Sequence, residues 1–231
     1  MTLWYDLKQA AKPVVGSLLN SDRIRRYALI AAYLPKFHAW CAAHPCERFA
    51  SRDLLFDAVL QATGVDAQLT YLEFGVFQGY SLRWWVEHAK HAGATFVGFD
   101  TFTGLPEDWT DDSPKGTYST NGQPPDIPDP RCTFVVGLIQ DTLPRYLRDH
   151  PVRHPLVVHF DADLYSAALF TLVTLAPIFR PGDILMLDEF GDYAHEFRAF
   201  DDTQNAYPIN WEVLGQNDQF SPFWRVALRV R

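Results

Sequence analysis

Cysteine is scarce in this sequence, and its scarcity argues against a fold held together by disulfides. Three cysteines, Cys41, Cys46 and Cys132, occur among 231 residues, an odd and sparse count for a disulfide framework. Cys41 and Cys46 are separated by four residues and no second pair follows, which also argues against a structural zinc site. Reduced thiols are typical of a reducing compartment, and we expect the protein in the cytoplasm.

Long apolar runs and clustered basic side chains are also missing. No segment approaches the ~20 apolar residues that cross a bilayer, and residues 1–20 lack the basic start and apolar stretch of a signal peptide. We therefore expect no membrane partner. The net charge is −8, and DRIRRY (22–27) is the densest basic group. Because Lys and Arg supply the attraction to a phosphate backbone, this balance argues against nucleic-acid binding.

Hydrophobic residues, in contrast, are plentiful and follow an ordered pattern. They make up 48% of the chain, with 15% aromatic, which suits a packed core at this length. Residues 1–68 predict helices interrupted by Pro13, Pro35 and Pro45, and SRDLLFDAVLQATG (51–64) has a serine cap and a glycine stop. We expect this segment to form a helical cap that shapes the substrate pocket, or a contact in a homodimer.

From residue 69 onward, short apolar runs alternate with helical stretches. Continuous apolar strands of this kind are typical of a parallel sheet covered on both faces, and right-handed crossovers make such a sheet doubly wound. The sequence predicts an α/β fold with a doubly wound, mostly parallel, seven-stranded sheet over residues 69–231, whose last two strands form an antiparallel edge hairpin. The predicted strands are TYLEFG (70–75), TFVGFD (95–100), TFVVG (133–137), LVVHFD (156–161), DILMLDEF (183–190), WEVLG (211–215) and FWRVALRVR (223–231).

Residues 101–131 form a long polar segment, rich in proline and glycine, between two predicted strands. Loops of this length inside a compact domain are usually functional lids or disordered insertions. We expect either a lid-like insertion that closes over a substrate or a plain surface insertion.

A glycine turn follows the first predicted strand. Gly75 and Gly79 would let the backbone approach a ligand, and the next helix would begin with free N–H groups. Phe77 stands where a GxGxxG dinucleotide turn requires its second glycine, which argues against an NAD(P)-dependent oxidoreductase. Glu73 could face an ammonium group, and Asp100, at the end of the second strand, is placed to bind a ribose diol. The turn and the acid together favour a ligand that contains a nucleoside.

Four separated motifs resemble the class I S-adenosylmethionine-dependent methyltransferases. EFGVFQGYS (73–81) is similar to the cofactor turn of catechol-type O-methyltransferases. GFDTFTGLPEDW (98–109), QDTLP (140–144) and FDADLYS…PGDILMLDEF (160–190) resemble the macrocin O-methyltransferase family, which methylates sugar hydroxyls in natural products. The resemblance covers residues 70–202 and implies a Rossmann-like methyltransferase domain.

The resemblance also implies roles for particular residues. The methionine end of the cofactor would meet the turn, the ribose would meet the second strand, and the adenine would meet the QDTLP motif. The family tends to carry a second aspartate where Glu189 stands. The implied cofactor residues are Glu73, Phe74, Gly75, Gly79, Ser81, Asp100, Phe102, Gln140 and Asp141, and the implied metal ligands are Asp161, Asp188 and Glu189.

The spacing of the acids supports a metal site independently of the resemblance. Asp161 and the pair Asp188–Glu189 end consecutive parallel strands, which would lie side by side about 4.8 Å apart. Carboxylates this close repel one another unless protons or a cation join them, and Mg²⁺ accepts such oxygen ligands. We expect Asp163 to cap the helix that begins near Tyr165 instead.

These observations predict an S-adenosylmethionine-dependent O-methyltransferase, assisted by a divalent metal, that acts on a small-molecule hydroxyl, preferably of a sugar or polyol. Asp161 would hold the metal and accept the hydroxyl proton, and His195 is the other candidate base. The alternatives are a metal-free methyltransferase, a non-catalytic cofactor-binding protein and, least favoured, an oxidoreductase.

Overall fold

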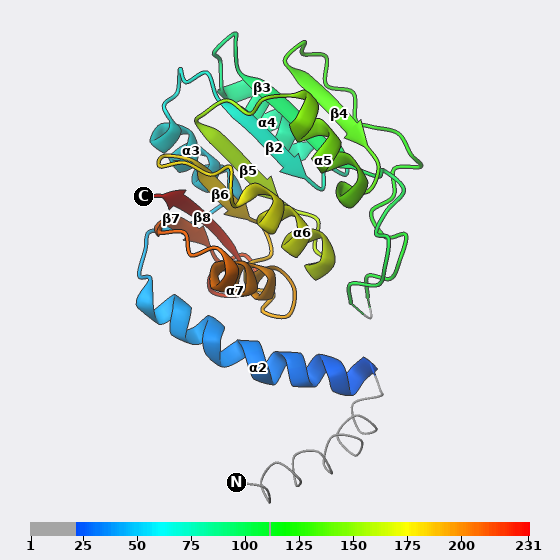
Figure 1. Cartoon of the computed structure of the whole chain (residues 1–231), viewed down its shortest axis with the longest axis vertical. Helices are drawn as coiled ribbons and strands as arrows, with labels where there is room; N and C mark the ends of the chain where they lie inside the picture. The colour runs from blue at the N-terminus through cyan, green and yellow to red at the C-terminus, as the bar shows by residue number, and fades with distance from the viewer. Residues whose placement is uncertain (1–21, 111) are drawn as a thin grey trace, which may run out of the picture. The chain divides into compact units, whose positions relative to one another are not determined.

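The computed structural model describes residues 22–110 and 112–231 and divides the chain into two compact units, Met1–Ala43 and His44–Arg231 (Figure 1). In the first unit it describes helix α2 (Asp22–Ala43), which contains Pro35. The expected break at Pro35 is therefore wrong, because the helix continues through the proline although its ring removes one backbone hydrogen bond. Pro13 and the segment compared with a signal peptide lie outside the described residues.

The second unit is built on a single sheet. Its strands are β1 (Arg48–Phe49), β2 (Thr70–Phe74), β3 (Thr95–Asp100), β4 (Cys132–Val136), β5 (Leu156–Phe160), β6 (Ile184–Leu187), β7 (Trp211–Asn217) and β8 (Arg225–Val230). In the described part of the chain these strands form an eight-stranded sheet in the order β1-β7-β8-β6-β5-β2-β3-β4. Strands β2 to β6 pair in parallel, whereas β8 is antiparallel to both β6 and β7.

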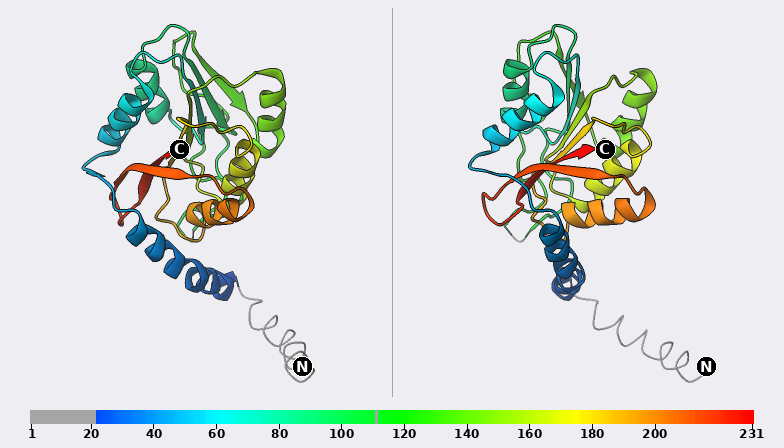
Figure 2. Two further views of the ribbon diagram at one scale, coloured as in Figure 1. Left: turned by 60° about the vertical axis from the view of Figure 1, so that its left-hand side comes forward. Right: turned by 90° about the vertical axis from the view of Figure 1, so that its left-hand side faces the viewer.

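Helices cover both faces of this sheet. They are α3 (Arg52–Thr63), α4 (Tyr80–His88), α5 (Ile139–Asp149), α6 (Tyr165–Leu175) and α7 (Glu196–Ala206). Helices α3 and α4 lie on one face, and α5, α6 and α7 lie on the other (Figure 2). The predicted doubly wound, mostly parallel sheet is thus confirmed, including its antiparallel edge hairpin. Among the residues that the structure describes, no helix combines the length and apolar character that crossing a membrane requires.

Strand β1 is an eighth strand beside the seven that the sequence predicts. It pairs in parallel with β7, with Arg48 opposite Gln216, and Asn217 Nδ2 donates a 2.9 Å hydrogen bond to the Phe49 carbonyl. A two-residue strand is too short to show alternation in the sequence. Its pairing places the start of the second unit at His44, well before the expected boundary at residues 68/69.

The main cluster of buried side chains lies between the sheet and helices α3 and α4. Tyr71 and Val157 point to this face because strand side chains alternate between faces. The Tyr71 ring stacks on Trp85 of α4 with centroids 4.9 Å apart, and Phe56 of α3 lies 6.0 Å from the same indole. Ser51 caps α3 as expected, since its Oγ accepts from the Leu54 N–H at 3.2 Å. Helix α3 therefore belongs to the core of the sheet domain.

Candidate active site

A cavity of about 490 Å³ opens at the carboxyl ends of the parallel strands. Its walls come from the loops after β2, β3, β4, β5 and β6. Strands β2 and β5 are neighbours, but the chain continues from them toward opposite edges of the sheet. The cavity therefore lies at the topological switch point, where open α/β sheets bind ligands. Its volume falls within the range of small-molecule sites.

The glycine turn forms one wall of the cavity and requires its glycines. Gly75 has φ +88°, and a Cβ there would lie 1.8 Å from the Asp161 carbonyl oxygen, so no side chain fits between the ends of β2 and β5. Gly79 has φ +75° at the start of α4, and its Cβ would meet Pro125 Cγ at 2.8 Å. The chain thus needs glycine for close packing at both positions.

Asp100 holds this turn together. Its Oδ2 accepts the Val76 and Phe77 N–H groups at 2.8 and 2.9 Å, and its Oδ1 accepts from Phe102 N–H at 2.7 Å. Asp100 also lines the cavity. The amide groups of the turn that could face a pyrophosphate are therefore already bound to a carboxylate.

A buried chain of hydrogen bonds runs beneath the cavity from β2 to β5. Ser81 Oγ donates to Glu73 Oε1 at 3.1 Å, and Tyr71 OH donates to Glu73 Oε2 at 2.6 Å. The Tyr71 oxygen also lies 2.8 Å from His159 Nδ1, and His159 Nε2 lies 3.5 Å from Asp188 Oδ1. This chain connects the acid of the glycine turn with the acid at the end of β6.

His159 carries a positive charge within this series of hydrogen bonds. The single Tyr71 hydroxyl proton is donated to Glu73, so Nδ1 of His159 must donate to the Tyr71 oxygen, while Nε2 faces a carboxylate that can only accept. Burial opposes the charge, but hydrogen bonds and charges of Asp188 and Glu73 outweigh it and raise the pKa of His159 to about 9.

Four carboxylates gather at the other end of the cavity, after β5 and β6. One oxygen each of Asp161, Asp163 and Glu189 lie within 4.8 Å of one another, and His159, Asp161 and Asp188 form a second such group. All four acids line the cavity. The side chain of Asp161 is 26% exposed, whereas Asp188 is 3% exposed. The sequence-predicted metal residues Asp161, Asp188 and Glu189 are therefore brought together in space.

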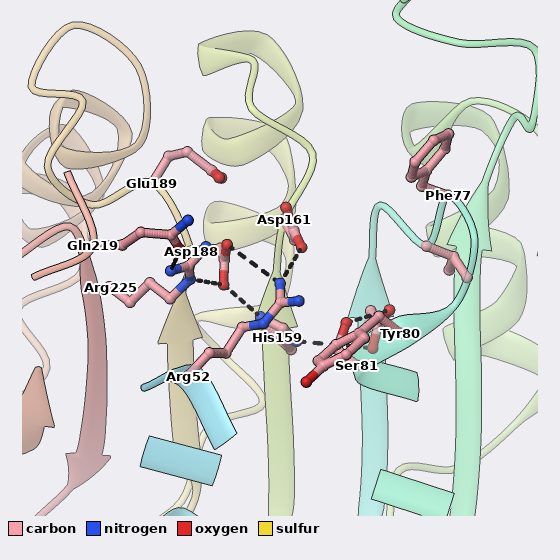
Figure 3. A network of polar contacts seen from close by, with 12 residues as sticks. Arg52, Phe77, Tyr80, Ser81, His159, Asp161, Asp188, Glu189, Gln219 and Arg225 are labelled. Atoms are coloured by element: carbon pink, nitrogen blue, oxygen red, sulfur yellow. Dashed lines mark hydrogen bonds and ion pairs between the residues drawn. The ribbon is translucent and has the colours of Figure 1, made fainter. Parts of the chain in front are cut away.

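Two arginines approach Asp188 and Asp161. Arg225 Nε donates to Asp188 Oδ1 at 2.7 Å, with both side chains buried. Arg52 Nη1 lies 3.9 Å from Asp188 Oδ2 and 4.0 Å from Asp161 Oδ2. Figure 3 shows the Arg52 guanidinium beside these two carboxylates, while Glu189 lies on the opposite side of them from Arg52.

The environment separates the pKa values of these acids. Burial, followed by the charge of Asp188, holds the pKa of Asp161 well above its ordinary value and raises that of Asp163 to about 7. Burial and the charge of Asp161 also hold the pKa of Glu189 high. For Asp188, burial is outweighed by hydrogen bonds from His159 and Arg225, which lower its pKa. Asp188 is thus a stable anion, whereas the other three need protons or a cation.

The expected role of Asp163 as a helix cap is wrong. Helix α6 has Leu164 at its N-cap and no side-chain cap hydrogen bond. Asp163 has φ +61°, in the left-handed region, and its side chain is buried at the cavity wall. The left-handed backbone thus turns this carboxylate toward the acid cluster. Hydrophobic periodicity and helix propensity in the sequence do not predict such a backbone conformation.

The other sequence-predicted residues divide into three groups. Gly75, Ser81, Asp100 and Gln140 line the cavity. Glu73 and Gly79 support its wall through the hydrogen bond to Ser81 and the close contact with Pro125. The predicted residues outside the cavity wall are Phe74, Phe102, Asp141 and His195.

The roles of these four residues remain predictions, and their surroundings are as follows. Phe74 and Phe102 are fully buried in the core, where Phe74 stacks on Phe99 at 4.8 Å. Asp141 lies in the first turn of α5, and its neighbour Gln140 lines the cavity wall. His195 Nδ1 accepts the Tyr165 N–H at 3.2 Å.

Several residues of the cavity wall were not predicted from the sequence. Arg52 reaches it from the start of α3, and Arg225 from the start of β8. Arg225 had a usable signal, because it is a charged residue at the head of an apolar strand, where buried charge is paired. Aromatic side chains complete the wall, namely Phe77, Tyr80, Trp109, Tyr118, Phe220 and Trp224.

The long segment 101–131 also contributes to the cavity. Leu105, Trp109 and Tyr118 line it. Trp109 Nε1 donates to Asp192 Oδ2 at 3.1 Å, and Ser166 Oγ donates to Glu107 Oε1 at 2.6 Å. The segment is therefore hydrogen-bonded across the cavity to α6 and to the loop after β6.

A doubly wound sheet, a glycine turn after β2 held by an acid from β3, and a cavity at the switch point define a class I, Rossmann-like methyltransferase fold. A protein-family model with the description "Methyltransferase domain" matches residues 72–190 of the sequence. The chain belongs to this family, and it is an S-adenosylmethionine-dependent methyltransferase. No curated protein matches the sequence.

Solved structures share the fold. CalS11, a calicheamicin methyltransferase, has 22% identity and a TM-score of 0.60, and the match covers 96% of this chain and 91% of that chain. The O-methyltransferase NovP has 20% identity and a TM-score of 0.55, covering 77% and 79%. The cmcI protein, in a structure with Mg and SAM, has 18% identity and a TM-score of 0.52, covering 78% and 72%. At these identities the likeness supports the fold alone.

Proposed function

We propose that this protein transfers the methyl group of S-adenosylmethionine to a hydroxyl of a small molecule, with a sugar or polyol as the favoured acceptor. The observation that carries the proposal is one cavity that joins the glycine turn and Asp100 at one end to the acid cluster at the other. A nucleoside-bearing donor and a hydroxyl acceptor can then meet within a single cavity.

The first part of the proposal concerns the donor. Its methionine moiety would meet Gly75 and Ser81, its ribose would meet the remaining acceptor capacity of Asp100, and its adenine would meet Leu138 and Gln140. The donor supplies an electrophilic methyl group on a sulfonium sulfur. Because Asp100 already binds two amides of the turn, a dinucleotide pyrophosphate would find few free donors there, which disfavours the oxidoreductase alternative.

The second part concerns the proton of the acceptor. An alcohol is a poor nucleophile at neutral pH and needs a positioned base. The side chain of Asp161 is more accessible than that of Asp188, with 26% of its surface exposed against 3%. Its raised pKa makes it a better proton acceptor once the cluster is ionised. Asp161 would receive the hydroxyl proton while Arg52 neutralises part of the surrounding charge.

The acid cluster also suits a divalent cation such as Mg²⁺. Carboxylate oxygens of Asp161 and Glu189 face the same space, and Glu189 Oε2 is buried without a hydrogen-bond partner. A buried carboxylate oxygen without a partner is costly and fits a site that takes a hard cation. When bound, such a cation would lower the pKa of a coordinated hydroxyl. The alternative is a metal-free enzyme in which Arg52, Arg225 and the charged His159 balance the acids.

The aromatic wall supports a sugar or polyol acceptor. Tyr118 and Phe220 line the cavity with 43% and 70% of their surface exposed, and exposed aromatic faces pack well against the apolar faces of sugar rings. CalS11 is described as a TDP-rhamnose 3'-O-methyltransferase, which agrees with this acceptor class. The N-terminal segment, residues 1–68, would extend the acceptor site or mediate a homodimer.

Calorimetric titration with S-adenosylhomocysteine tests the donor half of the proposal. We expect saturable binding, weakened at least about tenfold in Asp100→Asn, where the turn loses a charged acceptor for its amides. Absence of binding to folded protein would overturn the assignment. A parallel titration with NADH, followed by its fluorescence, should show none.

Methyl transfer to a panel of nucleotide sugars and polyols tests the acceptor half. Activity measured in chelator and after Mg²⁺ is added back separates the metal-assisted and metal-free readings. Binding of the donor without turnover on any acceptor would support a non-catalytic protein instead.

A further inference from the structure

We propose that the methyl acceptor carries a phosphate or diphosphate group, which binds in a second groove beside the cavity, at Arg48 and Arg52. This inference rests on the proposed function and deepens it by naming the chemical class of the acceptor.

The groove adjoins the cavity at its acceptor end. It has a volume of about 700 Å³ and is lined by two segments, residues 48–52 and 217–219. Arg52 lines both the groove and the cavity, and Gln219 of the groove directly precedes Phe220 of the cavity wall. A ligand whose hydroxyl lies at the acid cluster can therefore extend past Arg52 into the groove.

The groove has an excess of positive charge, although the whole chain has a net charge of −8. Its charged lining residues are Arg48, Arg52 and Asp218, so two guanidinium groups accompany one carboxylate. Arg48 Nε lies 2.7 Å from Asp218 Oδ2, and Asp218 Oδ1 accepts from the Phe223 N–H at 3.1 Å. Asp218 thus balances one arginine, and the groove as a whole favours an anion.

Arg52 keeps its hydrogen-bond donors available for a ligand. Within the described part of the chain its guanidinium donates no hydrogen bond, since Asp188 Oδ2 and Asp161 Oδ2 lie 3.9 and 4.0 Å from Nη1, beyond hydrogen-bond distance. The Tyr80 ring holds the guanidinium instead, with 4.4 Å between its centroid and the guanidinium carbon. A fixed guanidinium with unused N–H groups suits a phosphate, whose oxygens accept two parallel hydrogen bonds.

Arg48 offers a second guanidinium on a backbone that the sheet fixes. Strand β1 pairs with β7, with Arg48 opposite Gln216. Among the described residues, Asp218 is the acceptor beside this guanidinium, at Nε, which leaves both Nη groups for a ligand. Two arginines along a groove of this size exceed what one carboxylate needs, whereas a diphosphate presents oxygens to both. The acceptor class is therefore a sugar phosphate or a nucleotide sugar.

Calorimetric titration of the full-length chain with UDP, in saturating S-adenosylhomocysteine, tests this inference. The S-adenosylhomocysteine occupies the donor site, so the titration reports binding elsewhere. We expect saturable binding that weakens at least about tenfold in Arg48→Gln, because one charged donor group is lost. Arg48 is 65% exposed, so this variant should fold, and its binding of S-adenosylhomocysteine checks that it does.

Arg148→Gln is the matched control. Arg148 is 69% exposed and its Nε also pairs with an aspartate, Asp149, at 3.1 Å, but it lies on α5 outside the groove and the cavity. The control removes the same charge from the surface, and we expect its affinity for UDP to change less than about threefold. Equal weakening in Arg48→Gln and Arg148→Gln would overturn the inference, as would wild-type affinity in Arg48→Gln.

Inorganic pyrophosphate and glucuronate separate the sources of the anion. Binding of pyrophosphate that depends on Arg48 supports a phosphate-bearing acceptor, and Arg48-dependent binding of glucuronate without binding of UDP or pyrophosphate overturns it. Absence of saturable binding of both UDP and pyrophosphate to the wild-type protein would also overturn it. Wild-type protein that binds S-adenosylhomocysteine in these titrations but neither phosphate compound retains the proposed function, whereas failure to bind S-adenosylhomocysteine overturns the proposed function itself.

Discussion

At the scale of single residues, the site depends on backbone positions that only one residue type can occupy. Gly75 brings the end of β2 against the end of β5. A Cβ added at this residue would lie 1.8 Å from the Asp161 carbonyl oxygen. Packing and ligand access therefore rely on the same glycine, because any side chain would push the two strand ends apart.

A pair of glycine substitutions tests this packing. We expect Gly75→Ala to lower the free energy of unfolding by at least about 2 kcal/mol more than Gly122→Ala. Both glycines have positive φ, +88° and +75°, but a Cβ at Gly122 meets nothing within 4 Å. Urea unfolding of the two variants separates the steric cost of the added Cβ from the cost of backbone strain. Equal losses of unfolding free energy would show that the structure around Gly75 relaxes to accommodate the Cβ.

His159 predicts a pH dependence of stability. Its pKa is raised from 6.5 to about 9 in the folded protein, so its stabilising contribution is complete below pH 6.5 and is lost as the pH rises through 9. The difference in unfolding free energy between wild type and His159→Gln should therefore shrink by about 3 kcal/mol from pH 6 to pH 9.5. Urea unfolding in chelator at both pH values measures this, and a difference that grows with pH would contradict the assigned charge.

At the scale of elements, segment 101–131 bridges the cavity. It supplies Leu105, Trp109 and Tyr118 to the wall and is fastened to the opposite side by the Trp109–Asp192 and Ser166–Glu107 hydrogen bonds. Two side-chain hydrogen bonds are a modest attachment, worth about 0.5–1.5 kcal/mol each. This is the strength that a lid needs if it is to release its ligand.

Trp109→Phe should loosen this attachment while keeping an aromatic ring. We expect S-adenosylhomocysteine to dissociate about 3–10-fold faster, because one hydrogen bond of the closed segment is lost. The control is Trp211→Phe, which removes an indole hydrogen bond of 2.9 Å to Gln204 outside the cavity wall and should leave dissociation unchanged. Stopped-flow displacement measures both, and equal rates in the two variants would argue against a lid.

At the scale of the whole molecule, the described chain comprises a sheet domain that carries every residue of the cavity wall and a separate N-terminal unit. The domain begins at His44, because β1 pairs with β7 and α3 buries Phe56 and Val59 against the sheet. Its core therefore depends on residues that precede the first predicted strand.

Two truncations distinguish this boundary from the one expected at residues 68/69. We expect residues 44–231 to fold with a cooperative thermal transition, since that unit has its own core. Residues 69–231 lack α3 and β1 and should aggregate or lose the transition, because several core side chains have no replacement. Circular dichroism compares them, and cooperative folding of 69–231 would show that α3 is dispensable.

The sequence by itself determined the architecture of this protein and the class of its site. Five apolar runs alternating with helices predict the parallel sheet, since strands buried on both faces must be apolar throughout. The glycine turn, Asp100 and the acids at the ends of β5 and β6 could be located because strand ends meet at one edge. These features are local in the chain and leave a periodic signal.

Only the tertiary structure decided which of these acids act together and what balances them. Asp163 was expected to cap a helix and instead joins the cluster, because a single left-handed residue redirects its side chain. Arg52 and Arg225 lie 173 positions apart by number, yet both contact Asp188. Buried charges must be paired wherever the fold brings them together, and partners so distant in sequence leave no local pattern.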